Sequence, residues 1–451
     1  MKTWITLSLL LFCETLPGAE FRAGVARVKI TPPIPIWMSG YAARTHPAES
    51  ILQDLWAKAL VLSDSQGRRV AIVTTDLIGL PATVSNAVAE QLRVRLGLRR
   101  SELLLNSSHT HSGPVVRPNL NVLYELSPDD DAAAARYSAS LVENLVAVVE
   151  SAARDMAPAE LWSGHGSAGF GVNRREPASG GVRIGVNPAG PVDHDVPVLR
   201  VVSPDGRLRA ILFGYACHNT TLGGDSYSIN GDYAGFAQLE LEKRHPGATA
   251  MFFILCGADQ NPNPRGTVAH AQKYGIELAD GVDKALSGEM RALKSSLRSA
   301  FEETRLQFAE HSKETFVQES RNPDKYRQRR AKLMLAAYES GHPVRQINYP
   351  VQAIRIGDEL TILALGGEVV IDYALRAKRE YAGLDLVVAG YSNEVMCYIP
   401  SKRVLGEGGY EAVDSMIYYG QPGPFKDNVE ERIFNCIHKA LRKVGLRKSP
   451  E

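Results

Sequence analysis

Apolar runs typical of strands alternate along this chain with stretches of helical periodicity. We expect a strand where apolar residues run or alternate over about four to eight positions between turn residues. Strands are expected at residues 23–30, 55–62, 70–73, 103–105, 196–202, 208–214, 250–255, 305–308, 346–356, 360–365 and 386–389. Helices are expected at 84–96, 137–154, 233–243, 270–286 and 324–340, in a segment that ends at 381, and at 433–448. This interleaving predicts an α/β fold, a single large domain with mixed sheets flanked by helices.

Histidines follow two of the apolar runs. His109 and His111 stand two residues apart in the sequence NSSHTHSGP, so both imidazoles face one side while the chain stays extended. His218 also comes at the end of an apolar run. Histidines gathered on strand-end loops suit a metal ion and a proton transfer, whereas an isolated pair fits equally well a polar turn.

Other charged residues fall at strand ends and turns, and each has two interpretations. Asp76 is interpreted as a helix cap rather than as a carboxylate that orients a metal ligand, and Asp232 is placed to cap the helix that follows it. Asp193 and Asp195 flank a histidine, an arrangement found in metal clusters but more often in surface turns. Arg174 suits either a polar substrate group or a surface pair.

Composition and charge narrow the class of protein. The chain has 451 residues, of which 44% are hydrophobic and 22% charged, as in globular proteins. Its net charge of +1 gives no electrostatic reason to expect nucleic acid. Residues 1–19 have the charged start and short apolar core of a secretory signal, which predicts a secreted or periplasmic protein. No other segment has the apolar length of a transmembrane helix, so none is expected in the mature chain.

The cysteines and the basic C-terminal segment say less about function than the histidine motifs do. Four cysteines follow the signal, without a CxxC pair, so neither a disulfide scaffold nor a structural zinc knot is expected. We expect Cys217 and Cys256 to be buried free thiols. The helix at 433–448 is basic and amphipathic, which favours a docking helix over a peripheral membrane contact.

Several short motifs, in order, resemble the neutral/alkaline non-lysosomal ceramidase family. The resemblance extends from residue 24 to about residue 412. It rests on KITPP at 29–33, GYA at 40–42, HTHSGP at 109–114, CHN at 217–219, GDY at 231–233, GGE at 366–368 and GYE at 409–411. It implies a zinc hydrolase that cleaves the amide bond of an N-acylsphingosine.

The resemblance also implies the members of the site. It predicts one Zn²⁺ per chain, with ligands at His109, His218, Glu368 and Tyr410. His111 would be the catalytic histidine beside the metal, and Arg174 the arginine that faces the substrate. Two imidazoles and a carboxylate are a common zinc set, and such zinc lowers the pKa of bound water to about 7. Apart from the resemblance, Asp232 or the Asp193 and Asp195 pair could orient a ligand histidine, and the sequence leaves that choice open.

The chain departs from the family pattern at the catalytic serine. The family's Gly-Asp-x-Ser-Pro-Asn run matches ADQNPN at 258–263, where Asn261 takes the place of the serine. An amide donates a hydrogen bond to an oxyanion but has no hydroxyl to act as a nucleophile. Val115 and Val116 replace a glycine pair of the family. The chain ends about forty residues after Tyr410, which predicts that the family's C-terminal immunoglobulin-type domain is missing.

Together these observations predict a secreted zinc-dependent hydrolase whose catalytic domain spans residues 20–451. Its expected reaction is attack by zinc-bound hydroxide on the acyl carbon of an N-acyl lipid amide, with His111 as acid and base and Asn261 as oxyanion donor. The alternatives are a zinc hydrolase of a different amide or ester, a non-catalytic zinc-binding protein, and a metal-free structural protein. The expected partner is a small acyl-amide or lipid substrate.

Overall fold

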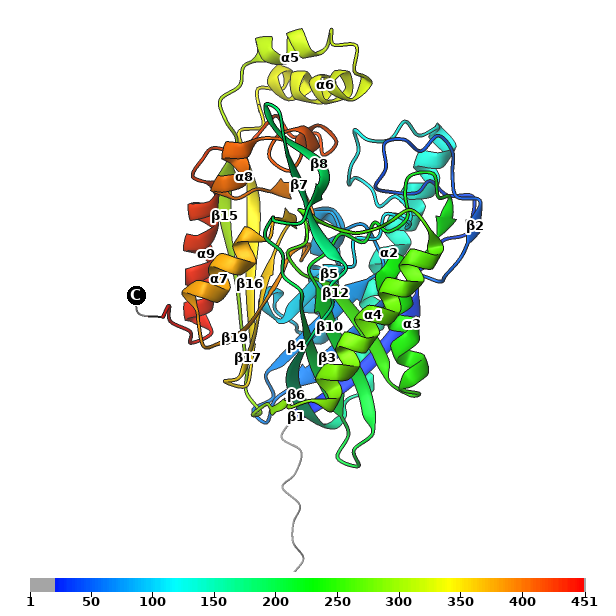
Figure 1. Ribbon diagram of the computed structural model, residues 1–451, viewed down its shortest axis with the longest axis vertical. Coiled ribbons are helices and arrows are strands. Elements are labelled where there is room, and N and C mark those ends of the chain that lie inside the picture. The colour runs from blue at the N-terminus through cyan, green and yellow to red at the C-terminus, as the bar shows by residue number, and fades with distance from the viewer. Residues whose placement is uncertain (1–20, 450–451) are drawn as a thin grey trace, which may run out of the picture.

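Two sheets packed face to face form the framework of the protein (Figure 1). The computed structural model describes residues 21–449, so the predicted signal at 1–19 lies outside the described residues. In the described chain the larger sheet has nine strands, eight of them in one path. In spatial order these are β12 (Thr249–Ile254), β10 (Leu208–Tyr215), β9 (Asp195–Val202), β6 (Ala157–Ser167), β1 (Phe21–Lys29), β3 (Trp56–Ser63), β4 (Arg69–Thr75) and β5 (Leu103–Ser107), with β14 (Arg291–Ala292) beside β6. The sheet is mixed, because β4 and β5 are parallel, β10 and β12 are parallel, and the other neighbours are antiparallel.

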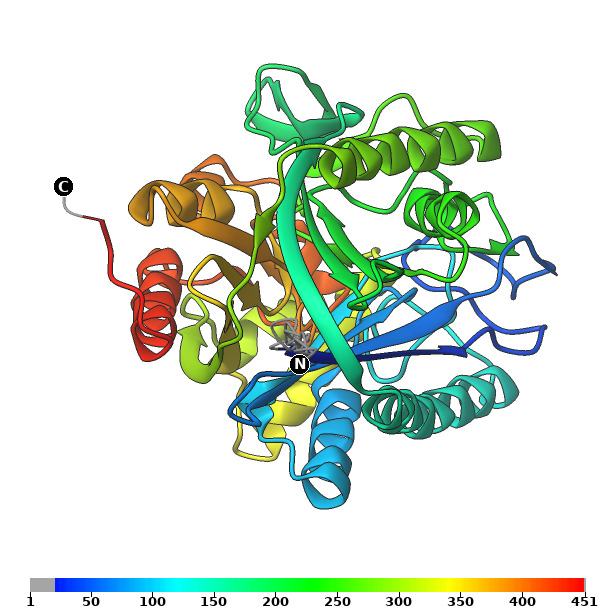
Figure 2. The same cartoon turned by 90° about the horizontal axis from the view of Figure 1, so that it is seen from below.

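Helices cover the outer faces of both sheets. The second sheet contains β15 (Leu297–Gln307), β16 (Gln346–Ile356), β17 (Leu360–Leu365) and β19 (Asp385–Ala389). The helices on the larger sheet are α1 (Ala82–Leu96), α2 (Pro128–Arg154), α3 (Asp232–Arg244) and α4 (Val268–Ser287); those on the smaller sheet are α7 (Asp372–Glu380) and α9 (Val429–Lys443). The layers therefore run helix, sheet, sheet, helix, as Figures 1 and 2 show.

The side-chain pattern of the central strands explains this layering. Successive residues of a strand point to opposite faces of the sheet. In β3, Leu60 and Leu62 pack in the core between the two sheets, whereas Ala59 and Val61 pack under α1 and α2. Both faces are buried, so the strands read as continuous apolar runs rather than alternating ones. The predicted α/β fold with mixed sheets and flanking helices is confirmed.

Small sheets and short helices shape the loops at one end of the framework. The small sheets pair β2 (Ser50–Ile51) with β11 (Ser228–Ile229), β7 (Gly171–Ala178) with β8 (Gly181–Asn187) and β13 (Gln260–Pro262), and β18 (Glu368–Val369) with β20 (Tyr398–Ile399). The remaining helices are α5 (Lys313–Glu319), α6 (Lys325–Glu339) and α8 (Lys402–Glu407), with 3₁₀ turns at Arg100–Glu102 and Asp414–Ile417. Helices α5 and α6 form an arm at the top of Figure 1.

The structure contains elements that were not expected from the sequence, among them β6, β7 and β8. Strand β6 contains Gly164 and Gly166, and glycine gives no strand signal. Glycine is required there because a Cβ on Gly166 would lie 1.9 Å from the carbonyl oxygen of Gly281 in α4. The interpretation of Asp76 as a helix cap is wrong. Its buried carboxylate accepts hydrogen bonds from the Trp56 N–H (2.8 Å) and from Gln238 Nε2 (2.9 Å) instead.

Other expectations about the chain agree with the structure. Cys217 and Cys256 are buried free thiols. The basic tail helix α9 docks on β15 and β16 through a buried apolar side. None of the helices formed by residues 21–449 is both long enough and apolar enough to cross a membrane.

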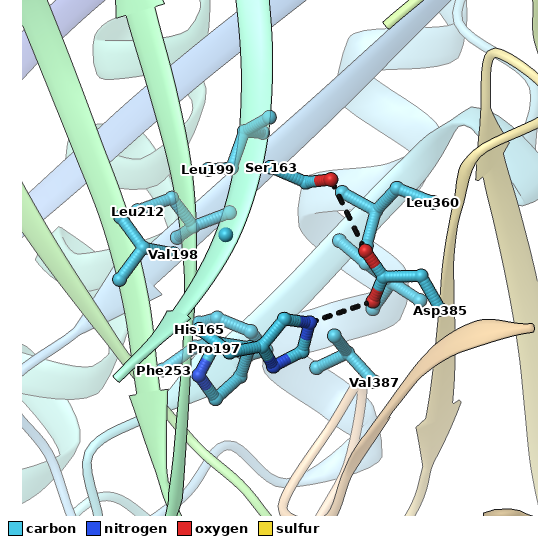
Figure 3. Close-up of a pocket in the computed structure, with 12 residues that line it drawn as sticks. Ser163, His165, Pro197, Val198, Leu199, Leu212, Phe253, Leu360, Asp385 and Val387 are labelled. Atoms are coloured by element: carbon cyan, nitrogen blue, oxygen red, sulfur yellow. Dashed lines mark hydrogen bonds and ion pairs between the residues drawn. The ribbon is translucent and has the colours of Figure 1, made fainter. Parts of the chain in front are cut away.

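A charged cluster fastens the two sheets together away from these loops. His165 of β6 contacts Asp195 Oδ1 of β9 through Nδ1 (2.8 Å) and Asp385 Oδ1 of β19 through Nε2 (3.1 Å). Figure 3 shows Asp385 reaching across to both His165 and Ser163. The hydrogen bonds to Asp195 and Asp385 raise the pKa of His165 to about 10. The imidazole is therefore a cation at neutral pH and bridges the two sheets.

Replacing His165 by alanine is expected to lower the free energy of unfolding by about 1 kcal/mol at pH 6, a small value because solvent screens this 43%-exposed side chain. The pKa is raised above the unfolded value, so the stabilisation is fully present below about pH 6.5 and is lost as the pH rises through about 10. Denaturant unfolding of both proteins at pH 6 and pH 10.5 measures this. The exposed His342→Ala variant is the control. A deficit in His165→Ala that is equally large at pH 10.5 would contradict the cationic clamp.

Candidate metal centre

The side chain of Asn106 brings together the strand ends that carry the histidines. It lies in β5, at one edge of the large sheet, whereas β12 forms the opposite end of the strand order. Asn106 Nδ2 donates to the carbonyls of Ile254 (3.3 Å) and Gly390 (2.9 Å), and Oδ1 accepts from the Ile254 N–H (2.9 Å). The sheet thus curls until its two edges meet. The loops that follow β5 and β10 consequently point at one place.

Three imidazoles and a carboxylate converge at this place. His109 Nε2 lies 3.2 Å from His218 Nε2 and 3.1 Å from His111 Nε2. Glu368 Oε2, from β18, lies 3.1 Å from the Nε2 atoms of both His109 and His218. Of the seven residues proposed for the site from the sequence, these four form the centre of the cluster.

Backbone carbonyls set the orientation of two of the imidazoles. His109 Nδ1 lies 2.6 Å from the carbonyl oxygen of Ile78, and His218 Nδ1 lies 2.9 Å from that of Gly257. A carbonyl only accepts, so each Nδ1 carries the proton. In the neutral ring each Nε2 then presents a bare lone pair to the centre of the cluster.

The electrostatics of this cluster match those of a cation site. Burial, together with the charge of Arg174, lowers the pKa of His218 to about 3. Burial opposes ionisation of Glu368, but His109 and His218 hold the pKa of its carboxyl well below the ordinary range. Glu368 Oε2 is also buried without a hydrogen-bond partner. Converging lone pairs and an unpaired buried carboxylate oxygen require a positive charge, and the ligand atoms of His109, His111 and His218 lie within 4.8 Å of one another, so the group can hold a metal ion.

Tyrosines surround the cluster, and no pattern in the sequence indicates the two that touch it. The Tyr398 hydroxyl lies 3.1 Å from His218 Nε2, and the Tyr419 hydroxyl donates to Glu368 Oε1 at 2.5 Å. Tyr410 lies in the wall of the same cavity, with its ring centroid 5.4 Å from that of Tyr398. A ligand role for Tyr410 stays a prediction.

Arg174 organises the polar side of the site. Its Nε donates to Glu411 Oε1 at 2.8 Å, and its Nη2 donates to the Tyr398 hydroxyl at 3.0 Å. Its Nη1 donates to Asn261 Oδ1 at 3.3 Å, as does Thr220 Oγ1 at the same distance. An arginine only donates, so the Asn261 atom that faces it is the carbonyl oxygen. Asn261 Nδ2 is thereby left as a hydrogen-bond donor beside the cavity.

The aspartates predicted to orient the histidines lie elsewhere. Asp232 accepts from the N–H groups of Leu222 (2.9 Å) and Tyr233 (2.6 Å), and it is the first residue of α3 rather than a residue before it. Lys378 Nζ binds Asp193 at 2.7 Å and Asp195 at 3.1 Å. These aspartates do not orient a ligand histidine, because backbone carbonyls accept from the Nδ1 atoms of His109 and His218.

A cavity of about 210 Å³ opens onto the cluster. Its polar lining residues include Arg174, Thr220, Asn261 and Arg265. Its apolar lining residues include Ile78, Leu120, Leu123 and Ile184. The first three of these apolar residues belong to one packed cluster, which gives the cavity an apolar side. An acyl chain fits such a side, and the polar side fits a hydrogen-bonding group.

Comparisons with known proteins agree on one family. Residues 21–276 match the N-terminal domain of the neutral/alkaline non-lysosomal ceramidases. The neutral ceramidase of Pseudomonas aeruginosa is 25% identical over 58% of this chain, a match that spans 40% of that protein. The neutral ceramidase of Mycobacterium tuberculosis is 24% identical, over 83% of this chain and 70% of that protein. The match to the Drosophila melanogaster enzyme, 24% identical, covers 56% of this chain and 37% of that protein.

Solved structures show the same fold. The crystal structure of the Pseudomonas aeruginosa neutral ceramidase superposes with a TM-score of 0.73 and 19% identity, over 96% of this chain and 76% of that one. A second structure, described as ceramidase complexed with C2, gives a TM-score of 0.69 and 18% identity, over 91% of this chain and 73% of that one. With more than half of its residues matched by the family's N-terminal domain, the chain belongs to the neutral/alkaline non-lysosomal ceramidase family.

Proposed function

We propose that this protein is a secreted zinc-dependent amidohydrolase that cleaves the amide bond of an N-acyl lipid resembling ceramide. The observation that supports it most strongly is the convergence of His109, His218 and Glu368 beside a cavity with an apolar and a polar side. Membership of the ceramidase family supports the same class of reaction.

The proposed metal is one Zn²⁺ per chain, held by His109, His218 and Glu368. Tetrahedral zinc with bonds of about 2.0–2.1 Å has neighbouring ligand atoms about 3.3 Å apart. The corresponding separations in the cluster are 3.1–3.2 Å, which fits zinc without rearrangement. The family resemblance assigns the fourth ligand to Tyr410, and the hydroxyl of Tyr398, 3.1 Å from His218 Nε2, is an alternative.

The residues of the chain have separate tasks in the proposed mechanism. Zinc in this site would supply an acidified water at neutral pH. Burial, together with His109 and His218, lowers the pKa of His111 well below its ordinary value, so its imidazole is neutral and can accept a proton from the attacking water. The same group then returns the proton to the departing amine nitrogen. Glycine at position 40 makes room for this ring, because a Cβ there would lie 2.4 Å from His111 Nδ1.

Asn261 has the position of an oxyanion donor. Its Oδ1 is held by Arg174 and Thr220, so its Nδ2 can donate to the oxygen that becomes negative when water adds to the acyl carbon. Asn261 cannot act as a nucleophile, and the proposed route therefore uses water. Arg174 is a positioning residue in this scheme, since three of its five N–H groups donate to Glu411, Tyr398 and Asn261.

A different amide or ester substrate is the second candidate. It is favoured by Asn261 at the position of the family's serine and by the small cavity, since pockets for drug-sized ligands usually measure about 300–1,000 Å³. Ile184 and Val186 of β8 are 47% and 46% exposed, and Ile184 also lines the cavity. A long chain could lie over these residues outside the cavity, or the protein could contact a lipid surface there.

Purified mature protein is expected to contain one zinc ion per chain and to release fatty acid from a fluorescent N-acylsphingosine. Elemental analysis and chromatography of the products measure the two quantities on the same preparation. Zinc without release would exclude ceramide and direct the search to other acyl substrates. Release that survives complete removal of zinc by a chelator would contradict the proposed mechanism.

A further inference from the structure

One arginine at the cavity stands without a partner. Arg265 lines the cavity and is exposed. Within residues 21–449, no carboxylate lies within ion-pair distance of its guanidinium, in contrast to Arg174, which is paired with Glu411. Arg44 also lies close to the cluster, and its guanidinium donates hydrogen bonds to the carbonyls of His111 and Ser226. Among the described residues that line the cavity, Arg265 is therefore the arginine whose charge no carboxylate pairs with.

The loop that carries Arg265 is held firmly on both sides of it. The Gly266 N–H donates to the carbonyl of Thr221 at 2.7 Å, and the Tyr274 hydroxyl donates to the carbonyl of Pro264 at 2.5 Å. This loop follows directly from β13, the strand that contains Asn261. Thr221 is next to Thr220, whose hydroxyl donates a hydrogen bond to Asn261 Oδ1. The loop anchored at Thr221 therefore holds Arg265 on the polar side of the cavity.

The charges that line the cavity favour an anion. Among the described residues that line the cavity, Glu368 is the one carboxylate, and it contacts His109 and His218. Arg265 brings a positive charge that no carboxylate compensates in the described chain, whereas Glu411 compensates the charge of Arg174. The hydroxyl headgroup of a ceramide offers Arg265 no charge, whereas a carboxylate matches its planar fork with two parallel hydrogen bonds.

We infer that the substrate is an N-acyl amino acid, whose carboxylate binds Arg265 while its acyl chain lies against Ile78, Leu120 and Leu123. This inference rests on the proposed function and names the substrate class of the same site. The carboxylate belongs on the amine side of the bond, because Arg265 lies on the polar side with Asn261 and the apolar side accepts the acyl chain. Water adds to the acyl carbon, the C–N bond breaks, and the nitrogen takes a proton, which gives a fatty acid and an amino acid.

The test compares two substrates that differ only in the group facing Arg265. N-dodecanoylglycine carries a carboxylate where N-dodecanoylethanolamine carries a hydroxymethyl group. Metal-loaded protein is expected to have a kcat/KM about tenfold higher for the glycine conjugate, and Arg265→Gln is expected to abolish this preference by lowering only that value. Arg265→Lys keeps the positive charge but loses the planar guanidinium, and it should retain part of the preference for the glycine conjugate. Arg136→Gln, an exposed arginine of α2 outside the cavity, is the matched control and should keep the full preference.

Each outcome decides the inference. Equal values for the two substrates in the parent protein, or an Arg265→Gln variant that loses both activities equally or neither, would overturn it while leaving the hydrolase function intact. If no acyl amide is cleaved, the proposed function fails, and calorimetric binding of N-dodecanoylglycine then decides the inference separately. Binding about tenfold weaker in Arg265→Gln supports anion recognition, and equal binding overturns it.

Discussion

Replacing His218 by alanine is expected to remove the zinc and to reduce the hydrolytic rate by about 1,000-fold or more. The His218 ring is fully buried, and its Nε2 is within 3.1–3.2 Å of three other polar atoms of the cluster. Alanine leaves Glu368 and His109 facing an empty space, and the several kcal/mol that a metal contributes to the transition state are lost. His109→Ala should give the same result. The double variant should be no worse than either single one, because the ligands act as a unit.

Zinc content and kcat, measured on the same samples, test this prediction. The exposed His342→Ala variant controls for the loss of a histidine in general and should keep both quantities. A chelator should also lower the melting temperature of the parent protein, since a ligand that binds only the folded state stabilises it. Full zinc content in both His109→Ala and His218→Ala would show that the zinc is bound at another place in the protein.

The sequence predicts the members of the cluster better than it predicts their arrangement. The position of His109 and His218 after apolar runs is visible in the sequence, since strand ends and loops have distinct residue patterns. Their meeting depends on Asn106, which joins the two edges of the large sheet through side-chain hydrogen bonds. A polar residue inside an apolar strand gives no indication of its distant partner. The convergence therefore follows from tertiary structure alone.

Residues that the sequence analysis missed or misjudged share a physical reason. Tyr398 and Tyr419 contact the cluster, yet a tyrosine in an apolar segment has the pattern of an ordinary core residue. Asp76 has the local pattern of a cap, but its carboxylate finds Trp56 and Gln238, which are distant in sequence. Strand β6 lacks a strand signal because it contains glycines, which allow α4 to pack closely against the strand. Local propensity is overridden wherever a long-range contact is worth more.

Replacing Asn261 by aspartate or by alanine is expected to lower kcat by about 100- to 1,000-fold with the zinc content unchanged, the usual cost of removing one oxyanion donor. The two changes separate two effects. Aspartate keeps an oxygen where Arg174 and Thr220 donate to Asn261 Oδ1, but it replaces the donating Nδ2 by an acceptor and adds a negative charge. Alanine removes the donor without adding a charge, so a loss of rate shared by both variants reports on the donor.

A matched control lies two residues further along the chain, just after β13. Asn263 is exposed, and Asn263→Ala should leave kcat and KM at their parent values. The split between kcat and KM distinguishes the roles of Asn261, because a donor that acts in the transition state changes kcat more than KM. Parent-like kcat in Asn261→Asp would show that position 261 only fills space. The oxyanion would then have to be stabilised by the metal site alone, and the replacement of the family's serine by asparagine would carry no catalytic role.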